Sequence, residues 1–119
     1  MNGKLALALV ALGCAAALTP APALAKTARC DITTADGERY RGPCDFTARK
    51  GGSFDLILPD AAAEIVYVNY IEVTLTAPGR ARIAGSVPGL GKLNQWGLVL
   101  RDKKAPACWQ GEWGRVCVY

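Results

Sequence analysis

The chain has 119 residues, a formal net charge of +4, five cysteines and no histidine. This length allows one domain, and the missing histidines remove the commonest general base and the commonest metal ligand. The basic residues are spread along the chain, often near acids, instead of forming the dense stripe that nucleic-acid binding requires. We therefore expect no nucleic-acid partner.

The first 25 residues have the pattern of a cleavable export signal. Lys4 supplies a positive charge, residues 5–18 are apolar or small, and Ala23-Leu24-Ala25 has the small residues that signal peptidase accommodates. We place the cut after Ala25, which leaves a single domain of residues 26–119 in the periplasm or secreted. Removing 25 of the 119 residues leaves 94, and the loss of Lys4 lowers the formal charge to +3.

Two other fates of this segment are weighed against cleavage. A membrane anchor needs about 20 apolar residues to cross a bilayer as a helix, and residues 5–18 supply only fourteen. Lipidation of Cys14 is suggested by Leu12-Gly13-Cys14, which resembles the end of a bacterial lipoprotein box. However, Ala11 stands where leucine is usual, and no polar tether follows. Cleavage after Ala25 is favoured, so the mature protein is not expected to span a membrane.

Alternation with period two dominates the mature part, and no segment shows a helical repeat of ten or more residues. Asp36-Gly37 predicts the turn of a first hairpin, whose second strand is expected to end at Gly42-Pro43. The stretch 64–76 is expected to bend near Asn69, with one helical turn at 61–64. Strands are predicted at 30–34, 39–41, 53–58, 64–76, 80–85 and 96–101, followed by a closing hairpin at 107–119.

Seven or eight short strands with frequent turns predict a mainly β fold. This pattern is typical of a small antiparallel sandwich or a partly open barrel, here held together by disulfides. The strand topology stays open.

Four cysteines remain after cleavage, and thiols in an oxidising compartment usually pair. If the last hairpin turns over Gly111-Glu112-Trp113-Gly114, Cys108 faces Cys117 within reach of a disulfide. The same construction centred on Gly37 places Cys30 opposite Cys44. These loops of fifteen and ten residues are each worth about 3 kcal/mol on the chain-entropy model. The spacings argue against a redox pair, and the compartment argues against a four-cysteine zinc site.

Catalytic patterns are weak in this sequence. The only serines, Ser53 and Ser86, lack the setting of a nucleophile elbow. Asp31 with Asp45, and Glu64 with Glu72, are carboxylate pairs on paper, but solvated strand and turn residues are the favoured interpretation. We therefore expect no enzyme, no cofactor and no metal, and a hydrolase that uses carboxylates alone is the remote alternative.

The aromatic residues provide the better functional signal. Trp113 falls at the tip of the last hairpin between Gly111 and Gly114, where an exposed indole would be a binding anchor, with Glu112 and Arg115 beside it. The alternative, which is favoured, is that Trp113 folds back over the disulfide or a neighbouring sheet. Trp96 and Trp109 are expected in the core or at its edge.

Three short motifs resemble small uncharacterised exported proteins of Gram-negative bacteria. They are Gly42-Pro43-Cys44, Gly52-Ser53-Phe54 and the ending 107–119 with its Cys-Trp and Cys-Val-Tyr. The resemblance implies a periplasmic or secreted β domain and assigns no activity or catalytic residue.

The leading hypothesis is a non-enzymatic envelope protein that binds another macromolecule, as an inhibitor or an accessory subunit. The alternative is a module that binds glycan or lipopolysaccharide through Trp113 and basic residues such as Arg115. The sequence does not identify the envelope protein or glycan that is bound.

Overall fold

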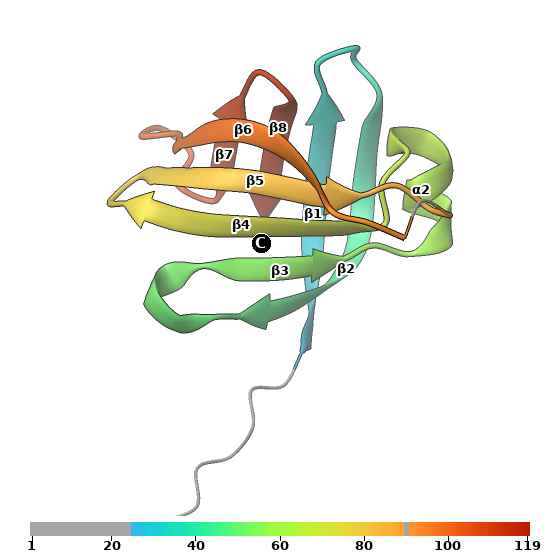
Figure 1. The fold of residues 1–119 in the computed structure, drawn as a ribbon, viewed down its shortest axis with the longest axis horizontal. Coiled ribbons are helices and arrows are strands. Elements are labelled where there is room, and N and C mark those ends of the chain that lie inside the picture. The colour runs from blue at the N-terminus through green and yellow to red at the C-terminus, as the bar shows by residue number, and fades with distance from the viewer. Residues whose placement is uncertain (1–24, 90) are drawn as a thin grey trace, which may run out of the picture.

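The computed structural model describes residues 25–89 and 91–119 (Figure 1). The predicted signal, apart from Ala25, and Cys14 lie outside the described residues. None of the helices in the described residues is long and apolar enough to cross a membrane. The strands are β1 (Lys26–Thr34), β2 (Arg39–Ala48), β3 (Phe54–Ile57), β4 (Tyr70–Ala77), β5 (Arg80–Ser86), β6 (Asn94–Arg101), β7 (Cys108–Gly111) and β8 (Gly114–Val118). The helices are the 3₁₀ helix η1 (Lys50–Gly52) and the α-helix α2 (Asp60–Val66).

The strands form a closed barrel in which each strand pairs with its sequence neighbours and β8 pairs back with β1. All these pairings are antiparallel. The predicted mainly β class with seven or eight strands is confirmed. Of the two predicted architectures the barrel is observed, and the pairing of β8 with β1 closes it.

Alternate residues of each strand fill the barrel interior. The fully buried side chains come from all parts of the barrel and include Ile32, Leu56, Ile71, Ile83, Val99, Trp109 and Val116. On β5, Ala81 and Ile83 are buried, whereas Arg80 and Arg82, which alternate with them, are exposed, as the period-two pattern predicts.

The connections gather at the two ends of the barrel, because the strands alternate in direction. One end, here called the α2 end, carries the turn after β1, helix α2, the loop after β5 and the tip between β7 and β8. The opposite end, here called the η1 end, carries the start of β1, η1, the Pro78-Gly79 turn and the segment 102–107. Figure 1 shows α2 and the η1 segment on opposite sides of the molecule.

The prediction that β2 ends at Gly42-Pro43 is wrong, because β2 continues to Ala48. Pro43 lies opposite Arg29, whose backbone N–H and C=O bond to Tyr119 on the other side of β1. The pairing of β2 with β3 starts only at Asp45. Pro43 therefore has no ladder bond to lose, and a proline is tolerated there.

The long strand predicted at 64–76 is also corrected. Its first part belongs to α2, which follows Pro59 and ends where Tyr67 adopts a left-handed backbone with φ of 58°. The alanines at 61–63 favour a helix, and the helix continues through the β-branched Ile65 and Val66. The bend predicted near Asn69 falls just before β4, which begins at the next residue, Tyr70.

Candidate functional site

Both predicted disulfides are present: Cys30 is bonded to Cys44, and Cys108 to Cys117. The last hairpin has the predicted register, with Cys108 opposite Cys117, Trp109 opposite Val116 and Gln110 opposite Arg115.

The register predicted for the first hairpin is wrong. Cys30 faces Gly42, and Cys44 faces Ala28, because the hairpin is centred on Asp36 instead of Gly37. Moving the centre by one residue moves every partner by two, so Cys30 and Cys44 stay on the same face of the sheet. They bond diagonally inside the barrel with Cα atoms 5.8 Å apart.

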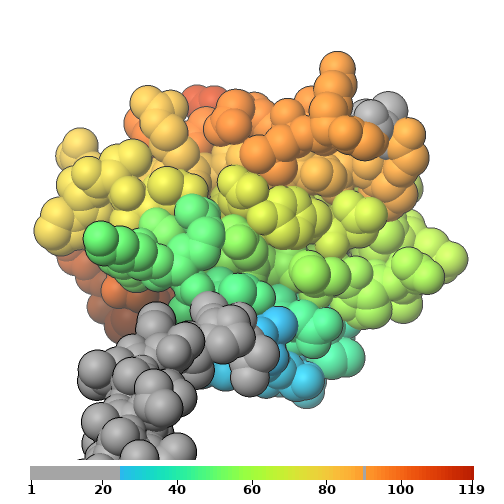
Figure 2. All heavy atoms as spheres, turned by 60° about the horizontal axis from the view of Figure 1, so that its bottom comes forward, coloured from blue at the N-terminus to red at the C-terminus, as the bar shows by residue number. Residues whose placement is uncertain are grey.

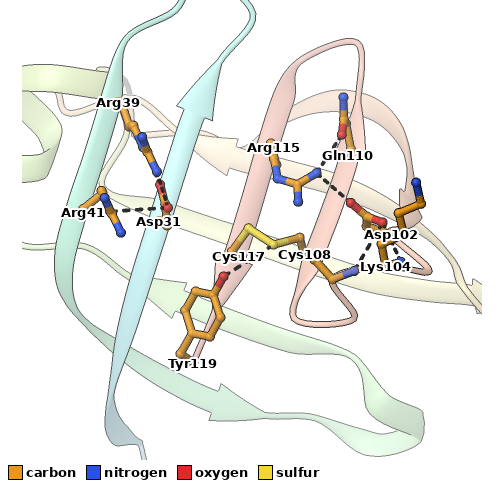
Figure 3. Close-up of a disulfide and its surroundings, with 11 residues drawn as sticks. Asp31, Arg39, Arg41, Asp102, Lys104, Cys108, Gln110, Arg115, Cys117 and Tyr119 are labelled. Carbon is orange, nitrogen blue, oxygen red and sulfur yellow. Dashed lines mark hydrogen bonds and ion pairs between the residues drawn. A yellow bond between two sulfur atoms is a disulfide. The ribbon is translucent and has the colours of Figure 1, made fainter.

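The Cys108–Cys117 disulfide lies on the outer side of the barrel wall, between two charged clusters (Figure 3). On β1 and β2, Arg39 donates two hydrogen bonds to Asp31, at 2.9 and 2.7 Å, and Arg41 lies 3.5 Å from the same carboxylate. The hydrogen bond from Arg39 lowers the pKa of Asp31 below its ordinary value, although partial burial opposes the shift. The pair also raises the pKa of the Arg39 guanidinium.

The second cluster holds Arg115, one of the predicted binding residues. Its guanidinium donates to Asp102 at 3.1 Å and to Gln110 at 2.8 Å. Hydrogen bonds lower the pKa of the Asp102 carboxyl. The largest effect comes from the backbone N–H of Lys104, and the next from the side chain of Arg115. Arg115 is thus a partly buried cation that already has two acceptors.

Trp113, the predicted anchor, is half-buried and packs against the core. Its ring lies parallel to that of Trp96, with centroids 4.5 Å apart and planes 1° apart. Its backbone carbonyl accepts a hydrogen bond of 2.9 Å from the N–H of Ala35 in the first turn. The hairpin tip is therefore folded back onto the α2 end of the barrel.

Trp96 reaches this stack because it stands at a bulge. Ile83 pairs with Gly97 and Ala84 with Gln95, so that Trp96 is the extra residue of β6. Gly97 has a φ of +100°, a conformation that favours glycine at a bulge of this kind. The indole then covers Gly85, where a Cβ atom would lie only 2.0 Å from the Trp96 ring. Glycine at position 85 is what makes room for Trp96.

Glu112 lines a groove beside the same tryptophan, on the outside of the barrel. The groove has a volume of about 560 Å³ and runs along β6 between Arg80 of β5 and the end of β7. Its lining includes Trp96, Gly97, Leu98, Leu100, Gly111 and Glu112.

Two leucines that line this groove are largely exposed. Leu98 is 60% exposed and Leu100 is 55% exposed. The register places Arg82 directly opposite Leu98, and places Arg80 and Gln110 on either side of Leu100. We call these five residues the leucine face.

The structure thus brings Glu112 and Arg115 to the borders of the leucine face, and it joins Trp113 to the face through Trp96. Sequence reasoning missed Leu98 and Leu100 as site residues, because it treated 96–101 only as a strand. The available signal was the pair of leucines that alternate with Val99 opposite the arginines of 80–85.

One carboxylate of each pair considered as catalytic is held by another side chain. Asp31 is held by Arg39 and Arg41, and Glu72 accepts a hydrogen bond of 2.8 Å from the hydroxyl of Tyr70. Burial, and then this bond, raises the pKa of Tyr70. Within residues 25–89 and 91–119 no three histidine, cysteine, aspartate or glutamate side chains are grouped as a metal site would require.

Comparison with known proteins gives no relative for this chain. No family model matches it, and neither a curated protein nor a solved structure does. The resemblance to exported proteins of Gram-negative bacteria stays a prediction.

Proposed function

We propose that this protein is an exported, non-enzymatic binding protein that attaches to another protein of the cell envelope through its leucine face, as an inhibitor or an accessory subunit. The observation that carries the proposal is the exposure of Leu98 and Leu100 beside two exposed arginines of β5 on a rigid barrel wall. Exposed apolar side chains grouped on one surface and surrounded by polar residues mark interaction sites.

The charges next to the leucines indicate the chemistry of the partner. Neither Arg80 nor Arg82 forms an ion pair with another of the described residues. Both are exposed and lie on the same side of the leucines. A partner surface with an apolar side chain for the groove and carboxylates for the two arginines would complement this face, and such charges would also speed association.

A rigid scaffold supports this role. The groove lies on paired strands, and the neighbouring Cys108–Cys117 disulfide links β7 to β8. Little conformational entropy would therefore be lost from this side when a partner binds. Two disulfides also fit export to an oxidising compartment, the periplasm or the exterior, and the absence of histidine from the chain supports a non-enzymatic role.

Binding of glycan or lipopolysaccharide through Trp113 and Arg115 is the alternative, and it has less support. Trp96 covers one face of the Trp113 ring, and Arg115 is already bonded to Asp102 and Gln110.

The experiment is capture from envelope extracts by the wild-type protein and by matched variants. Leu100→Asp places a carboxylate on the leucine face, whereas Ile57→Asp does the same at an outer position of β3 that is 53% exposed. We expect one envelope protein to be retained by the wild type and by Ile57→Asp, and lost with Leu100→Asp. Retention of the same proteins by all three would contradict the proposal, and retention of glycan alone would favour the alternative.

A further inference from the structure

A second cavity opens at the η1 end of the barrel, away from the leucine face. Its volume is about 450 Å³, within the range of roughly 300–1,000 Å³ that is typical of small-molecule sites. Its walls include Ala28 and Val118 with three aromatic rings, those of Phe46, Phe54 and Trp109. An eight-stranded barrel has an interior that side chains fill or that holds one small ligand.

Two cations occupy inward-facing positions at the mouth of this cavity. Lys26 is two residues before Ala28 and four before the buried Cys30, and Arg101 is two residues after the buried Val99. Side chains two apart share a face of a strand. The alternation that turns Cys30 and Val99 into the barrel therefore also directs Lys26 and Arg101 toward the opening of the cavity. Inward-facing positions of a barrel usually carry apolar residues, but here they carry two cations.

Each cation lies over an aromatic ring of the neighbouring strand. Lys26 pairs with Phe46 across β1 and β2, and its Nζ is 5.5 Å from the ring centroid. Arg101 pairs with Trp109 across β6 and β7, and its Cζ is 4.9 Å from that ring centroid. Phe46 in turn stacks on Phe54 at 5.3 Å. Cations and aromatic rings thus form one continuous lining.

Neither cation has a carboxylate partner in the described part of the chain. Among the residues that the structure describes, no acidic group lies within ion-pair distance of Lys26 or Arg101. The acidic residue that follows Arg101, Asp102, is bonded to Arg115 on the outer side of the wall. Two positive charges beside an apolar cavity are therefore available to an anion.

The opening is at the molecular surface. Figure 2 shows the first residues of β1, in blue, exposed beside the teal residues of β2. Lys26, Arg101 and Tyr119, which line the mouth, are all exposed. Cleavage at the predicted site after Ala25 would add the α-ammonium group of Lys26 to the same region.

We propose that the cavity at the η1 end binds an anionic amphiphile, whose apolar chain lies against Phe46, Phe54 and Trp109 while its anionic head contacts Lys26 and Arg101. The apolar walls supply affinity by removing the chain from water. The two cations supply charge-assisted hydrogen bonds, which are stronger than neutral ones. This site is separate from the leucine face. The two share no residue, although both include residues of β6.

The test uses calorimetric titration of decanoate into the exported protein purified from cells that express the full chain. Arg101→Gln removes a cation from the mouth, and Lys92→Gln removes one from the exposed loop after β5 at the α2 end, so both variants change the net charge equally. Loss of a hydrogen bond to a charged group should weaken decanoate binding about tenfold or more in Arg101→Gln. Lys92→Gln should bind like the wild type, and decyltrimethylammonium, with the same chain and the opposite charge, should bind poorly.

Two further arms define the outcome. Ala28→Phe fills the cavity and should abolish binding, with thermal unfolding as the check that this variant folds. Sedimentation with phosphatidylglycerol vesicles distinguishes a lipid headgroup from a free amphiphile: Arg101-dependent sedimentation assigns the site to membrane lipid, and decanoate binding without sedimentation assigns it to a free anion. Equal decanoate affinities for Arg101→Gln and Lys92→Gln, or no decanoate binding by the wild type, would overturn the proposal.

Discussion

Trp96 and Trp113 come from different hairpins and stack in parallel over the α2 end of the barrel, with their ring centroids 4.5 Å apart. The contact depends on a bulge in β6 and on the small residue Gly85 beneath the Trp96 ring. Both rings pack against the core, and Trp96 also lines the groove of the leucine face.

The stack should contribute to stability in a way that needs both rings. Trp96→Ala and Trp113→Ala should each lower the free energy of unfolding by about 1–3 kcal/mol, and the double variant by less than their sum. The difference, about 0.5–1.5 kcal/mol, is the coupling of an aromatic pair. Urea unfolding of the four proteins measures it.

Leu98→Ala is the matched control, because Leu98 is 60% exposed. It should change the free energy of unfolding by no more than about 0.5 kcal/mol. Strict additivity of the two tryptophan substitutions would show that the rings do not interact.

The two disulfides should differ in what their removal costs. Each closes a short loop worth about 3 kcal/mol on the chain-entropy model. All four cysteines are buried, but only Cys30 and Cys44 pack within the core cluster inside the barrel. Replacing both with alanine should therefore lower the free energy of unfolding more than replacing Cys108 and Cys117, because a cavity adds to the loss of the cross-link.

Unfolding in urea under non-reducing conditions compares these two double variants. An equal loss in both would mean that the barrel collapses around the missing sulfur atoms. A larger loss in the Cys108 and Cys117 variant would contradict the expectation.

Acid should destabilise the protein partly through Asp31. Its pKa is lowered in the folded state, mainly by the hydrogen bond from Arg39. The stability from this pair is therefore present above the unfolded pKa of about 3.9 and is lost as the pH falls through the lower, folded value. Asp31→Asn should be less stable than the wild type at pH 7 and should lose less on acidification.

Unfolding measured between pH 7 and pH 2 gives the comparison. Asp36→Asn is the control, since Asp36 is exposed in the first turn and its carboxylate forms no ion pair with the described residues. Parallel pH profiles for the wild type and Asp31→Asn would exclude this contribution.

Much of the fold could be predicted from period-two alternation and turn residues, because these signals are local. The Cys108–Cys117 register followed from a two-residue tip between glycines. The register of the first hairpin could not be predicted in this way, since Asp36-Gly37 fixes a turn but not its centre, and the chain turns one residue earlier. Closure of the barrel depends on contacts between β1 and β8, which are remote in sequence and leave no local pattern.

The candidate sites were harder to predict than the strands. The position of Trp113 at the tip of the last hairpin suggests an exposed side chain. Its burial depends on stacking with Trp96, which a bulge in β6 makes possible, and periodicity in the sequence does not reveal that bulge. Likewise, the sequence gives no reason to distinguish Lys26 and Arg101 from ordinary surface charges. Only the strand register shows that they share a face with the inward-facing residues of β1 and β6.

The most direct test of the proposed function is site-specific photocrosslinking in intact cells, with the photoreactive residue p-benzoylphenylalanine at position 98, 100 or 57. The leucine-face proposal predicts the same single protein adduct from positions 98 and 100 and none from position 57. Arg80→Glu with Arg82→Glu should remove that adduct. Identical adducts from all three positions, or an adduct from position 57 alone, would contradict attachment through the leucine face.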